Sequence, residues 1–437
     1  MTKPCRILAL TAIEAPFRST LIRTQLYEPL CRVRQLRPGT EVCSLALVPW
    51  TFFFGRRRPW RTLAANVRRL RRLRDELDRS GIALRVRPLP FPLLPCHFNL
   101  NRTQRLLFTA GALPALLSYL LVRSRYDLVM ARSYPAALLA RLARRVAGVP
   151  YLFDLRGMYP EEGVNAGAFG AGSRDYHDWK RIERRLIGDA ERCVVVSPPF
   201  AAHVRSIVPG ARVDVIPCCV DPAAFRYDEA ARVRAKAARG LAGRFVLLHL
   251  GSFGAPGDRG LAGKYLLRFK RAEPSAMLVV ASGTPAFGPA IDRALRGEGL
   301  GPDDYRIVHP VDGGVAELLA LGDAGLVLER RTASTKVCLS VKLGEYLASG
   351  LPVICTPHVE GAAGLVERYD AGLVVDPDGD EPIGKESMFI KRLPQLRQNG
   401  FRLVDEVLAI DRCAAQWSET ITAALARRKE RQCSPKC

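Results

Sequence analysis

The chain has 437 residues, of which 48% are hydrophobic and 25% are charged. This length and balance are typical of two or three globular domains with buried cores, and they exclude long disorder, a collagen-like repeat and a small disulfide-stapled fold. The 66 Lys and Arg residues outnumber the 43 Asp and Glu residues, so the formal charge is +23. Such a charge favours an anionic partner, for example a nucleotide, a lipid headgroup or a nucleic acid, without choosing among them.

Short apolar segments alternate with helical stretches along most of the chain. In the first half we expect helices at 61–79, 135–147 and 174–188, and strands at 6–11, 42–48, 82–88, 127–131, 150–154, 192–196 and 212–216. A second series of strands is expected at 245–250, 277–281, 305–308, 324–328, 353–355 and 373–375. This alternation is typical of βαβ units around parallel sheets. The sequence therefore predicts an α/β protein with two Rossmann-like domains.

The domain boundaries follow from this order. Residues 1–227 are predicted to form the first domain, 228–244 a polar linker, and 245–412 the second domain. Residues 413–437 are predicted to form a helix that crosses back to the first domain and ends in a frayed tail. Ligands of open α/β sheets bind beyond the carboxyl ends of the strands, so we expect the site in the cleft between the two domains.

Targeting and membrane signals are weak in this sequence. The first ten residues predict a strand and lack the long apolar region of a signal peptide. The 12 Cys residues are scattered without paired metal-site spacing, so reduced thiols in a cytosol are expected. The uncharged run Leu106–Val122 predicts a buried helix, with membrane-surface contact as the alternative and no integral span.

The most informative segment is Ser340–Ile354, with the sequence SVKLGEYLASGLPVI. It predicts a loop, a short helix ended by Gly350 and a buried strand. Lys342 and Glu345 are three residues apart and so share one helix face. Backbone N–H groups at a helix start, with a Lys beside them, suit a diphosphate, and a carboxylate one turn later can accept hydrogen bonds from a ribose diol. From the pattern alone, the alternative is an exposed ion pair on a surface helix.

This segment resembles the signature of GT-B glycosyltransferases of the retaining family-4 type, in which K-x-x-E-Y-x-A-x-G-x-P-V-I borders the nucleotide-sugar donor. Three further segments resemble the family in the expected order: Arg192–Ser197, Val215–Phe225 and Leu248–Ser252. They correspond to a strand ending in a cleft Ser, the segment that closes the first domain, and the first strand and glycine turn of the donor domain. The resemblance covers nearly the whole chain and implies a GT-B fold, a nucleoside-diphosphate sugar as donor, and transfer with retention.

The resemblance also implies roles on the donor side. Lys342 would bind the phosphate and act as the catalytic cation, and Glu345 would bind the ribose. The turn Gly251–Ser252 would approach the diphosphate.

The sequence departs from the family pattern at two donor-side positions. Val337 stands where the family often carries a sugar-binding Glu, and Ser252 stands where an Arg is usual. We therefore expect Arg259 or Lys264 to take over the phosphate contact of that Arg.

The acceptor side is expected after the strands of the first domain. Ala131–Tyr134 and Tyr151–Glu162 resemble the acceptor-side loops of bacterial polysaccharide glycosyltransferases, and Thr11–Pro16 resembles a variant with S/T-x-I-E-x-P. Charged side chains at this end of a strand are poor for stability and useful for ligand contact. The expected catalytic residues there are Asp154 and Arg156, and the expected acceptor-side residues are Glu14, Arg18, Arg132 and Glu161. The alternative is an internal Arg132–Asp154 ion pair that orders the loop.

A basic and aromatic segment, Phe52–Arg61 with the sequence FFFGRRRPWR, precedes an arginine-rich helix. Aromatic side chains beside clustered cations suit an anionic bilayer surface. The alternative is a solvated helix face with the Phe side chains packed inside. Nucleic acid is not expected, because no groove-reading motif accompanies the segment.

Together these features predict a hexosyltransferase-type glycosyltransferase of polysaccharide biosynthesis, cytoplasmic and peripheral on the inner face of the plasma membrane. It would move a sugar from a nucleoside-diphosphate sugar to a glycan or lipid-linked acceptor. No metal ion and no cofactor are expected, because cationic side chains and helix-start N–H groups stabilise the leaving diphosphate in such a site. Two alternatives stay open: a GT-B epimerase or phosphorylase, and a catalytically degenerate GT-B subunit that binds a partner.

Overall fold

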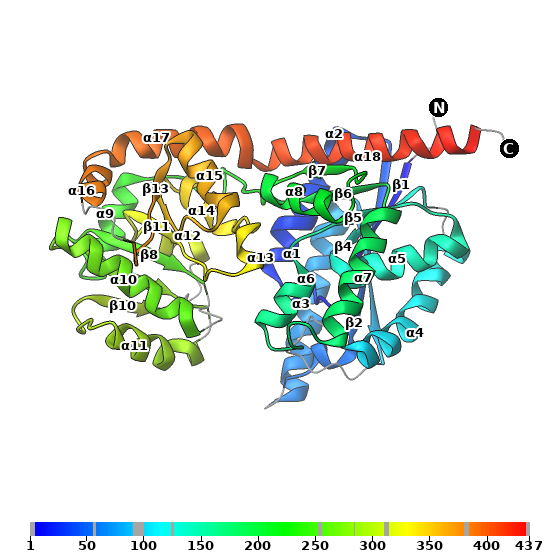
Figure 1. The fold of residues 1–437 in the computed structure, drawn as a ribbon, viewed down its shortest axis with the longest axis horizontal. Coiled ribbons are helices and arrows are strands. Elements are labelled where there is room, and N and C mark those ends of the chain that lie inside the picture. Colours follow the sequence, from blue (N-terminus) through cyan, green and yellow to red (C-terminus); the bar gives the residue numbers. More distant parts are fainter. Residues whose placement is uncertain are drawn as a thin grey trace. The chain divides into compact units, whose positions relative to one another are not determined.

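The structure is a computed structural model that describes residues 5–55, 58–90, 100–123, 126–251, 256–283, 285–309, 314–379 and 384–433. The chain divides into two compact units. The first unit comprises Met1–Ile216 and Cys413–Cys437, and the second comprises Pro217–Arg412. Each unit is built on a parallel sheet that helices flank (Figure 1).

Within the described residues, the first unit holds a seven-stranded sheet in the order β3-β2-β1-β4-β5-β6-β7. Its strands are β1 (Cys5–Ala12), β2 (Thr40–Pro49), β3 (Ile82–Leu89), β4 (Leu128–Arg132), β5 (Tyr151–Asp154), β6 (Arg192–Val195) and β7 (Val213–Val215). The central strand β1 pairs in parallel with β2 on one side and β4 on the other. The strand order reverses at this point, where open α/β sheets bind their ligands at the carboxyl ends of the strands.

Helices of the first unit connect these strands. They are α1 (Thr20–Ile22), α2 (Glu28–Leu36), α3 (Pro59–Arg79), α4 (Arg102–Ser118), α5 (Ser133–Ala147), α6 (Tyr159–Asn165), α7 (Arg174–Asp189), α8 (Pro198–Ile207) and most of α18 (Ile410–Cys433). The last of these is held to the rest of the unit by polar contacts. The Thr420 hydroxyl donates a hydrogen bond of 3.0 Å to the carboxylate of Asp214, and the Arg37 guanidinium donates one of 3.2 Å to the carbonyl of Ser418.

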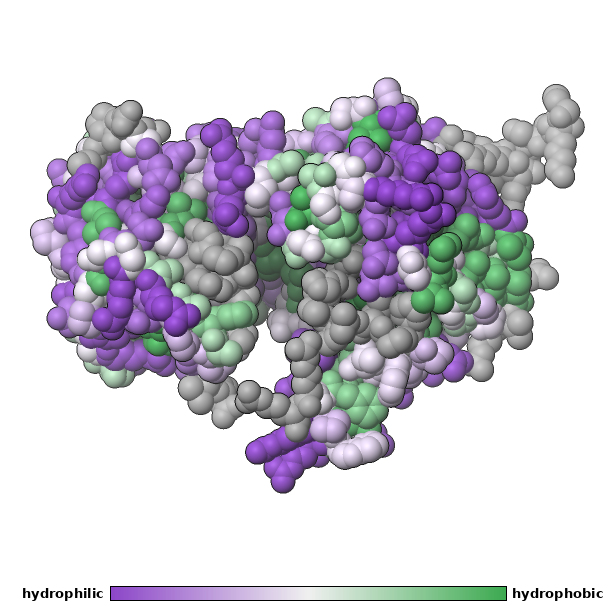
Figure 2. All heavy atoms as spheres, turned by 60° about the horizontal axis from the view of Figure 1, so that its bottom comes forward, coloured by the Kyte–Doolittle hydropathy of each residue, from purple (hydrophilic) through white to green (hydrophobic). Residues whose placement is uncertain are grey.

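Helix α4 differs from the buried helix that the sequence predicts. It buries Phe108 and Leu116, whereas Leu106 and Leu107 are 61% and 54% exposed, and Leu121 in the turn that continues the helix is 57% exposed. Residues 102–121 are long and apolar enough to cross a membrane by length and composition, and 33% of that stretch is buried. Figure 2 shows the hydrophobic surface of the first unit on its right-hand side, where Figure 1 places α4. One side of α4 therefore packs on the unit, and the other presents an uncharged surface.

The basic and aromatic segment is divided between core and surface. Phe53 is buried and its ring centroid lies 4.8 Å from that of Phe17, in a small cluster to which Phe52 and Phe54 also belong. Trp60 is 74% exposed. Of its arginines, Arg56 and Arg57 lie outside the described residues. The packed phenylalanines thus follow the alternative reading of this segment.

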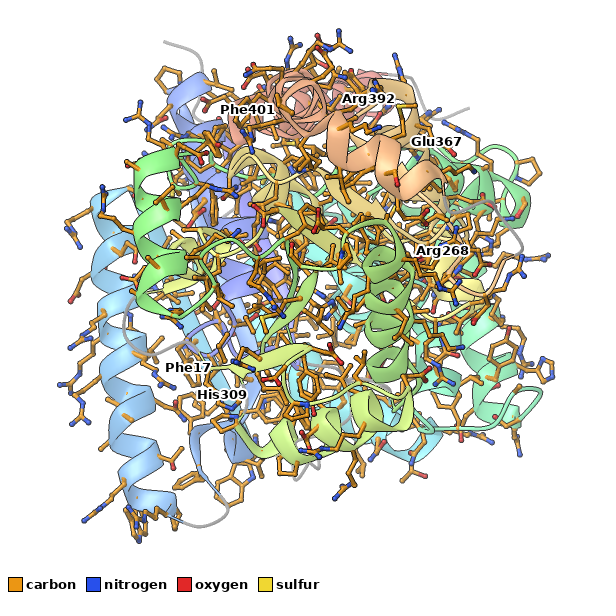
Figure 3. All side chains as sticks on the ribbon, turned by 90° about the vertical axis from the view of Figure 1, so that its left-hand side faces the viewer. Phe17, Arg268, His309, Glu367, Arg392 and Phe401 are labelled. Atoms are coloured by element: carbon orange, nitrogen blue, oxygen red, sulfur yellow. The ribbon has the colours of Figure 1, made fainter. Side chains whose placement is uncertain are left out.

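Within the described residues, the second unit holds a six-stranded sheet in the order β10-β9-β8-β11-β12-β13. Its strands are β8 (Val246–Leu250), β9 (Met277–Ala281), β10 (Tyr305–Val308), β11 (Ala324–Val327), β12 (Val353–Cys355) and β13 (Gly372–Val374). Its helices are α9 (Glu229–Ala238), α10 (Pro256–Ala272), α11 (Gly288–Gly297), α12 (Gly314–Leu319), α13 (Ala333–Lys336), α14 (Val341–Ala348), α15 (Glu360–Tyr369), α16 (Gly384–Lys391) and α17 (Leu393–Leu403). Arg268 of α10, labelled in Figure 3, forms a buried ion pair with Glu386 after 2.6 Å.

The two ends of the second unit are tied to each other. The N–H of Val220 donates to the carbonyl of Leu408, and the N–H of Ile410 donates to the carbonyl of Val220. The N···O distance is 2.9 Å in both hydrogen bonds. This pairing closes the second unit as an insertion between two parts of the first.

The boundary between the units lies earlier than predicted. The sequence places it after residue 227, with a linker at 228–244, whereas the structure places it after Ile216. Helix α9 occupies most of the expected linker and belongs to the second unit. Arg232 and Lys236 of α9 each lie 2.7 Å from a carboxylate oxygen of Asp323. A polar helix on a domain surface has the same composition as a linker, so the sequence pattern did not distinguish them.

We expect Asp323→Ala to destabilise the second unit by about 2–4 kcal/mol. The change removes the shared counter-ion of Arg232 and Lys236 and leaves Arg232 only the longer 4.0 Å pair with Glu229. It also removes the acceptor for the N–H of Val246, 2.7 Å away. Urea unfolding followed by circular dichroism measures the loss. Asp303→Ala, at an exposed position of the same unit, is the control and should change the stability little. Equal stabilities of the two variants would contradict this role of Asp323.

Candidate functional site

The carboxyl end of β8 and the start of α14 bring two predicted residues together. Gly251 follows β8 with φ of +118°, a conformation that residues with a side chain rarely adopt. A Cβ atom at Gly251 would lie 3.1 Å from Cε and 3.2 Å from Nζ of Lys342. The Lys342 ammonium therefore lies directly against the backbone of the glycine turn, and Lys342 itself belongs to the first turn of α14.

A hydrogen bond between β8 and α14 holds Lys342 close to the glycine turn. The N–H of Leu250 donates to the hydroxyl of Tyr346 after 2.7 Å, which ties the end of β8 to α14. The ring of Tyr346 is fully buried and packs over Gly325, where a Cβ atom would come within 2.3 Å of the ring. The glycine in β11 thus makes room for the tyrosine that positions Lys342.

Glu345 stands one turn after Lys342 and has an unusual protonation equilibrium. Burial raises the pKa of Glu345 to about 7, and the neighbouring Lys342 offsets part of that shift. His249 lies in β8 and is buried. Burial, followed by the charge of Lys342, lowers the pKa of His249 well below its usual range, so its ring is neutral. The sequence analysis did not single out His249, because a histidine within an apolar strand is typical of a core position.

The remaining donor-side predictions have different outcomes. Ser252 and the side chain of Arg259 lie outside the described residues. Lys264 forms an ion pair with Asp378 after 2.7 Å, so its charge already has a partner on the surface. Val337 is buried at the end of α13, which leaves an apolar side chain where the family often has a carboxylate.

In the first unit, four predicted residues meet at the carboxyl ends of β1, β4 and β5. Arg132 is buried and lies 3.5 Å from Asp154 and 3.5 Å from Glu14. Arg156 lies 3.4 Å from the other oxygen of Asp154. Burial raises the pKa of Glu14, against the opposing effect of Arg132. The internal Arg132–Asp154 pair that the sequence offered as an alternative is therefore present, within a larger charged cluster.

The backbone beside this cluster is strained. Ile13 and Ser133 have φ of +66° and +65°, in the left-handed region that non-glycine residues seldom occupy. Each position of this kind costs about 1–3 kcal/mol and is found mostly at functional sites. The two residues directly precede Glu14 and follow Arg132, so the strain serves to orient these side chains.

A second group of polar side chains surrounds Glu161. Lys180 of α7 lies 3.0 Å from Glu161 and also forms an ion pair with Glu183. The Tyr176 hydroxyl donates a hydrogen bond of 3.2 Å to the carboxylate of Glu161, and the Tyr134 hydroxyl donates one of 2.6 Å to the carboxylate of Glu183. Glu161 is therefore held in one position by α7.

The sequence analysis missed two members of this region. Burial, with a contribution from Glu161, raises the pKa of Glu162 to about 7. Its carboxylate lies over Gly157, where a Cβ atom would come within 1.8 Å of Oε1. Burial and the charge of Lys180 lower the pKa of His203, whose buried Nε2 has no hydrogen-bond partner among the described residues. Glu162 could have been found from its place in the resembling loop, whereas no sequence signal pointed to His203.

Among the described residues, Arg18 forms no ion pair with the charged cluster of Glu14, Arg132, Asp154 and Arg156. It donates to the carbonyl of Phe52 after 3.1 Å and lines a separate cavity with α3. Its predicted contact with the acceptor beside Glu14 therefore stays a prediction.

These arrangements can bind and stabilise anions and hydroxyl groups. Among the described residues, no group of three His, Cys, Asp or Glu side chains lies where it could hold a metal ion. Charge stabilisation would come from Lys342 and backbone N–H groups, each worth a few kcal/mol when preorganised.

Comparisons with known proteins identify a domain in the first half of the chain and the fold of the whole. Residues 37–219 match the family model described as "Glycosyl transferase 4-like domain". No curated protein matches the chain. Among solved structures, the chain is similar to sucrose-phosphate synthase from Thermosynechococcus elongatus, with a TM-score of 0.68 and 17% identity over 97% of this chain and 100% of that one.

Two other solved structures are similar over nearly the same length. One is Anabaena Alr3699/HepE in complex with UDP-glucose, with a TM-score of 0.61 and 16% identity over 96% of this chain and 99% of that one. The other is the trehalose-6-phosphate synthase OtsA, with a TM-score of 0.62 and 12% identity over 96% of this chain and 99% of that one. At identities this low, the structural similarity shows a shared fold and nothing further.

We expect Glu345→Gln to stabilise the protein at pH 8 and to have little effect near pH 5. The folded-state pKa of Glu345, about 7, lies above its ordinary value of 4.5. The ionised carboxylate therefore destabilises the fold above pH 7, and this penalty disappears as the pH falls toward the unfolded-state value. The gain at pH 8 should be about 1–3 kcal/mol, measured by urea unfolding at both pH values. A gain that is the same at pH 5 and pH 8 would contradict the raised pKa.

Proposed function

We propose that this protein transfers a sugar from a nucleoside-diphosphate sugar to a glycan or lipid-linked acceptor. The proposal rests on the match of residues 37–219 to a glycosyl transferase 4-like domain and on the GT-B glycosyltransferase fold. The proposal includes a hexosyl donor and retention of configuration, as the resemblance of the Ser340–Ile354 segment implies. It also includes a role in polysaccharide biosynthesis on the cytoplasmic side.

The observation that carries the proposal is the contact between Lys342 and the Gly251 turn. Departure of a nucleoside diphosphate develops negative charge on phosphate oxygens, and a site for it needs fixed positive groups without steric obstruction. Gly251 offers a surface without a side chain, and Lys342 offers an ammonium beside the N-terminus of α14. Glu345, one turn later, is placed to accept hydrogen bonds from a ribose diol. The related HepE structure holds UDP-glucose, which is a donor of this class.

The acceptor is proposed to contact the charged cluster of the first unit. Asp154 is held by both Arg132 and Arg156, so its carboxylate keeps a defined orientation toward an incoming hydroxyl group. Glu14 and Glu161 would bind further hydroxyl groups of the acceptor. Carboxylates and guanidinium groups are suited to this task, because sugars offer many donors and acceptors in fixed directions.

We expect Lys342→Ala to lower turnover by about 100- to 1,000-fold, the range for the loss of one preorganised charge stabiliser. The fold should persist, since the Lys342 side chain is only partly buried. The measurement is a mass-spectrometric screen of nucleotide sugars with the purified protein, followed by kinetics with the accepted donor. Lys391→Ala, at an exposed lysine of the same unit, is the control and should leave the rate unchanged.

Two results would change the assignment. A folded Lys342→Ala variant with a rate within a few-fold of the native protein would contradict the phosphate role of Lys342. Nucleotide-sugar binding by the native protein without turnover, with every acceptor class supplied, would favour the degenerate partner-binding subunit that the buried Val337 suggests.

A peripheral attachment of the first unit to an anionic membrane is the second part of the proposal. Two features support it. Helix α4 exposes Leu106 and Leu107, and the turn that continues it exposes Leu121. Trp60 is exposed beside Arg58 and Arg61. Exposed apolar and aromatic side chains next to cations are suited to a bilayer interface.

We expect the variant with Arg56, Arg57, Arg58 and Arg61 changed to Ser to sediment less with anionic vesicles than the native protein does. Each arginine near such a surface contributes about 1 kcal/mol, so the four together contribute about 4 kcal/mol. Binding of the native protein should fall as salt is added, because the charges act through a screened aqueous layer.

The control variant loses the same charge from the second unit. It changes four exposed arginines to Ser, namely Arg234, Arg239, Arg271 and Arg293. Equal sedimentation of both variants, or none of the native protein, would remove the membrane attachment and leave the transferase proposal in place.

A further inference from the structure

A cavity of about 390 Å³ in the first unit lies between the loop after β1 and one face of α3. To its wall, the segment after β1 supplies Arg18, Thr20 at the start of α1 and Arg23 just after α1, and α3 supplies Arg69, Arg72 and Glu76. The three α3 residues are spaced by three and four positions, so they lie along the same face of the helix. We call this the arginine cavity. We infer that it binds a phosphate or diphosphate group, at a site separate from Lys342 and the Gly251 turn.

The charges of the arginine cavity do not cancel. Arg23 lies 2.9 Å from Glu76 and 3.5 Å from Glu28, so two carboxylates face this one cation. Arg69 and Arg72 are exposed and form no ion pair with any described residue. Four arginines, those of the wall, thus stand against two carboxylates, and the group keeps a net positive charge.

Arg18, Arg69 and Arg72 are all exposed, so water and salt screen their mutual repulsion in the absence of a ligand. A bound anion would supply the counter-charge directly. The guanidinium group presents its N–H donors in a planar fork that matches the oxygens of phosphate, and several forks around one cavity favour a group with more than one negative charge. The volume is also within the range of ligand pockets.

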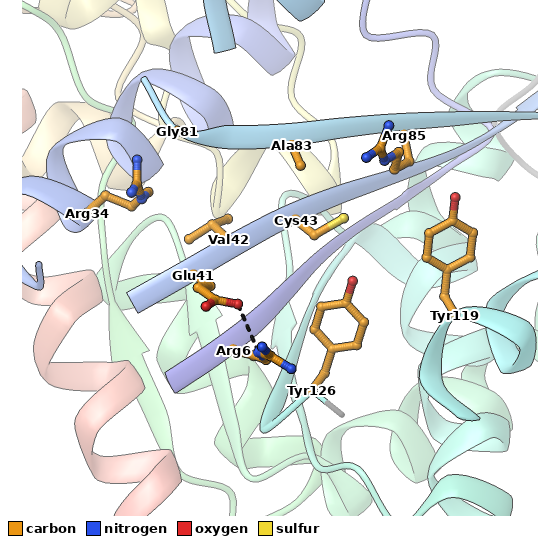
Figure 4. A pocket seen from close by; sticks show the side chains of 10 residues that line it. All are labelled: Arg6, Arg34, Glu41, Val42, Cys43, Gly81, Ala83, Arg85, Tyr119 and Tyr126. Atoms are coloured by element: carbon orange, nitrogen blue, oxygen red, sulfur yellow. Dashed lines mark hydrogen bonds and ion pairs between the residues drawn. The ribbon is translucent and has the colours of Figure 1, made fainter. Parts of the chain in front are cut away.

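A second cavity of the first unit shows the contrast. It has a volume of about 540 Å³, lies at the amino ends of β1–β3 and also contains arginines (Figure 4). There Arg6 forms an ion pair with Glu41 after 2.8 Å, and Arg34 donates to the carbonyls of Thr40 and Ser80. Arg6 and Arg34 therefore have partners within the fold, whereas Arg85 of this wall forms no ion pair with a described residue. The arginine cavity has three arginines without an ion pair to a described residue, Arg18, Arg69 and Arg72.

The position of the arginine cavity suggests which molecule carries the phosphate. This assignment rests on the proposed function. Arg18 stands four residues after Glu14, so the two Cα atoms lie at most about 14 Å apart. Arg18 also donates to the carbonyl of Phe52, in the segment proposed to meet the membrane. A lipid-linked acceptor has its phosphate between its lipid and its sugar. With that phosphate in the arginine cavity, the lipid would run toward the Phe52–Arg61 segment and the sugar toward Glu14.

The binding test compares two double variants of α3. Arg69→Ser/Arg72→Ser removes two cations of the cavity, and Arg68→Ser/Arg71→Ser removes two exposed cations of the same helix that do not line it. Both are made in the Lys342→Ala background, so that the donor site contributes little. Inorganic pyrophosphate is titrated by calorimetry. We expect the cavity variant to bind at least about tenfold more weakly than its background, and the control variant to stay within about twofold.

The outcomes of this titration are distinct from those of the transferase assay, because pyrophosphate binding requires no sugar transfer. An equal loss in both double variants would show a diffuse charge effect and overturn the site. An unchanged affinity in the cavity variant would overturn it as well.

Vesicle binding then separates the two sources of phosphate. Phosphatidylcholine vesicles are prepared with either phosphatidylglycerol or a polyprenyl diphosphate. A loss for the cavity variant that is confined to the polyprenyl diphosphate vesicles supports the acceptor assignment. An equal loss with both vesicle types would assign the cavity to bilayer headgroups and overturn the acceptor assignment, while the anion site itself would stand.

Discussion

The hydrogen bond between the N–H of Leu250 and the hydroxyl of Tyr346 is the contact on which the donor side depends. It joins a strand end to a helix, and it exists only because Gly325 leaves space for the tyrosine ring. Above it, the glycine turn and Lys342 are brought within van der Waals distance. A cation can approach a backbone this closely only where no side chain intervenes, so the chemistry of the site follows from the absence of two Cβ atoms.

Electrostatic balance differs between the two charged regions of the first unit. Around Asp154, each cation faces a carboxylate, and the cluster is nearly self-contained, with strained residues on either side of it. In the arginine cavity the balance is missing. A protein with a formal charge of +23 can place most of its cations harmlessly in solvent, so a concave group of unpaired arginines is more informative than the total.

The sequence predicted the positions of the strands, because runs such as 277–281 and 324–328 are apolar throughout, as is typical of strands buried on both faces. It also singled out both Lys342 and the glycine turn, since both belong to recognisable segments, whereas their direct contact comes from the structure. The side of α4 that packs was not predictable, because an uncharged helix offers no polar face to mark the solvent. His249 and His203 were missed for a related reason: their surroundings come from elements distant in the sequence.

The insertion of the second unit into the first has a consequence for synthesis of the protein. Val220 and Leu408 close the second unit on itself, whereas the first unit needs residues 413–437, which follow Ile216 only after the whole second unit. On the ribosome, therefore, the second unit can complete its fold before the first. The N-terminal sheet, although made earliest, must wait for the last helix, with the edge next to Asp214 uncovered until Thr420 has emerged.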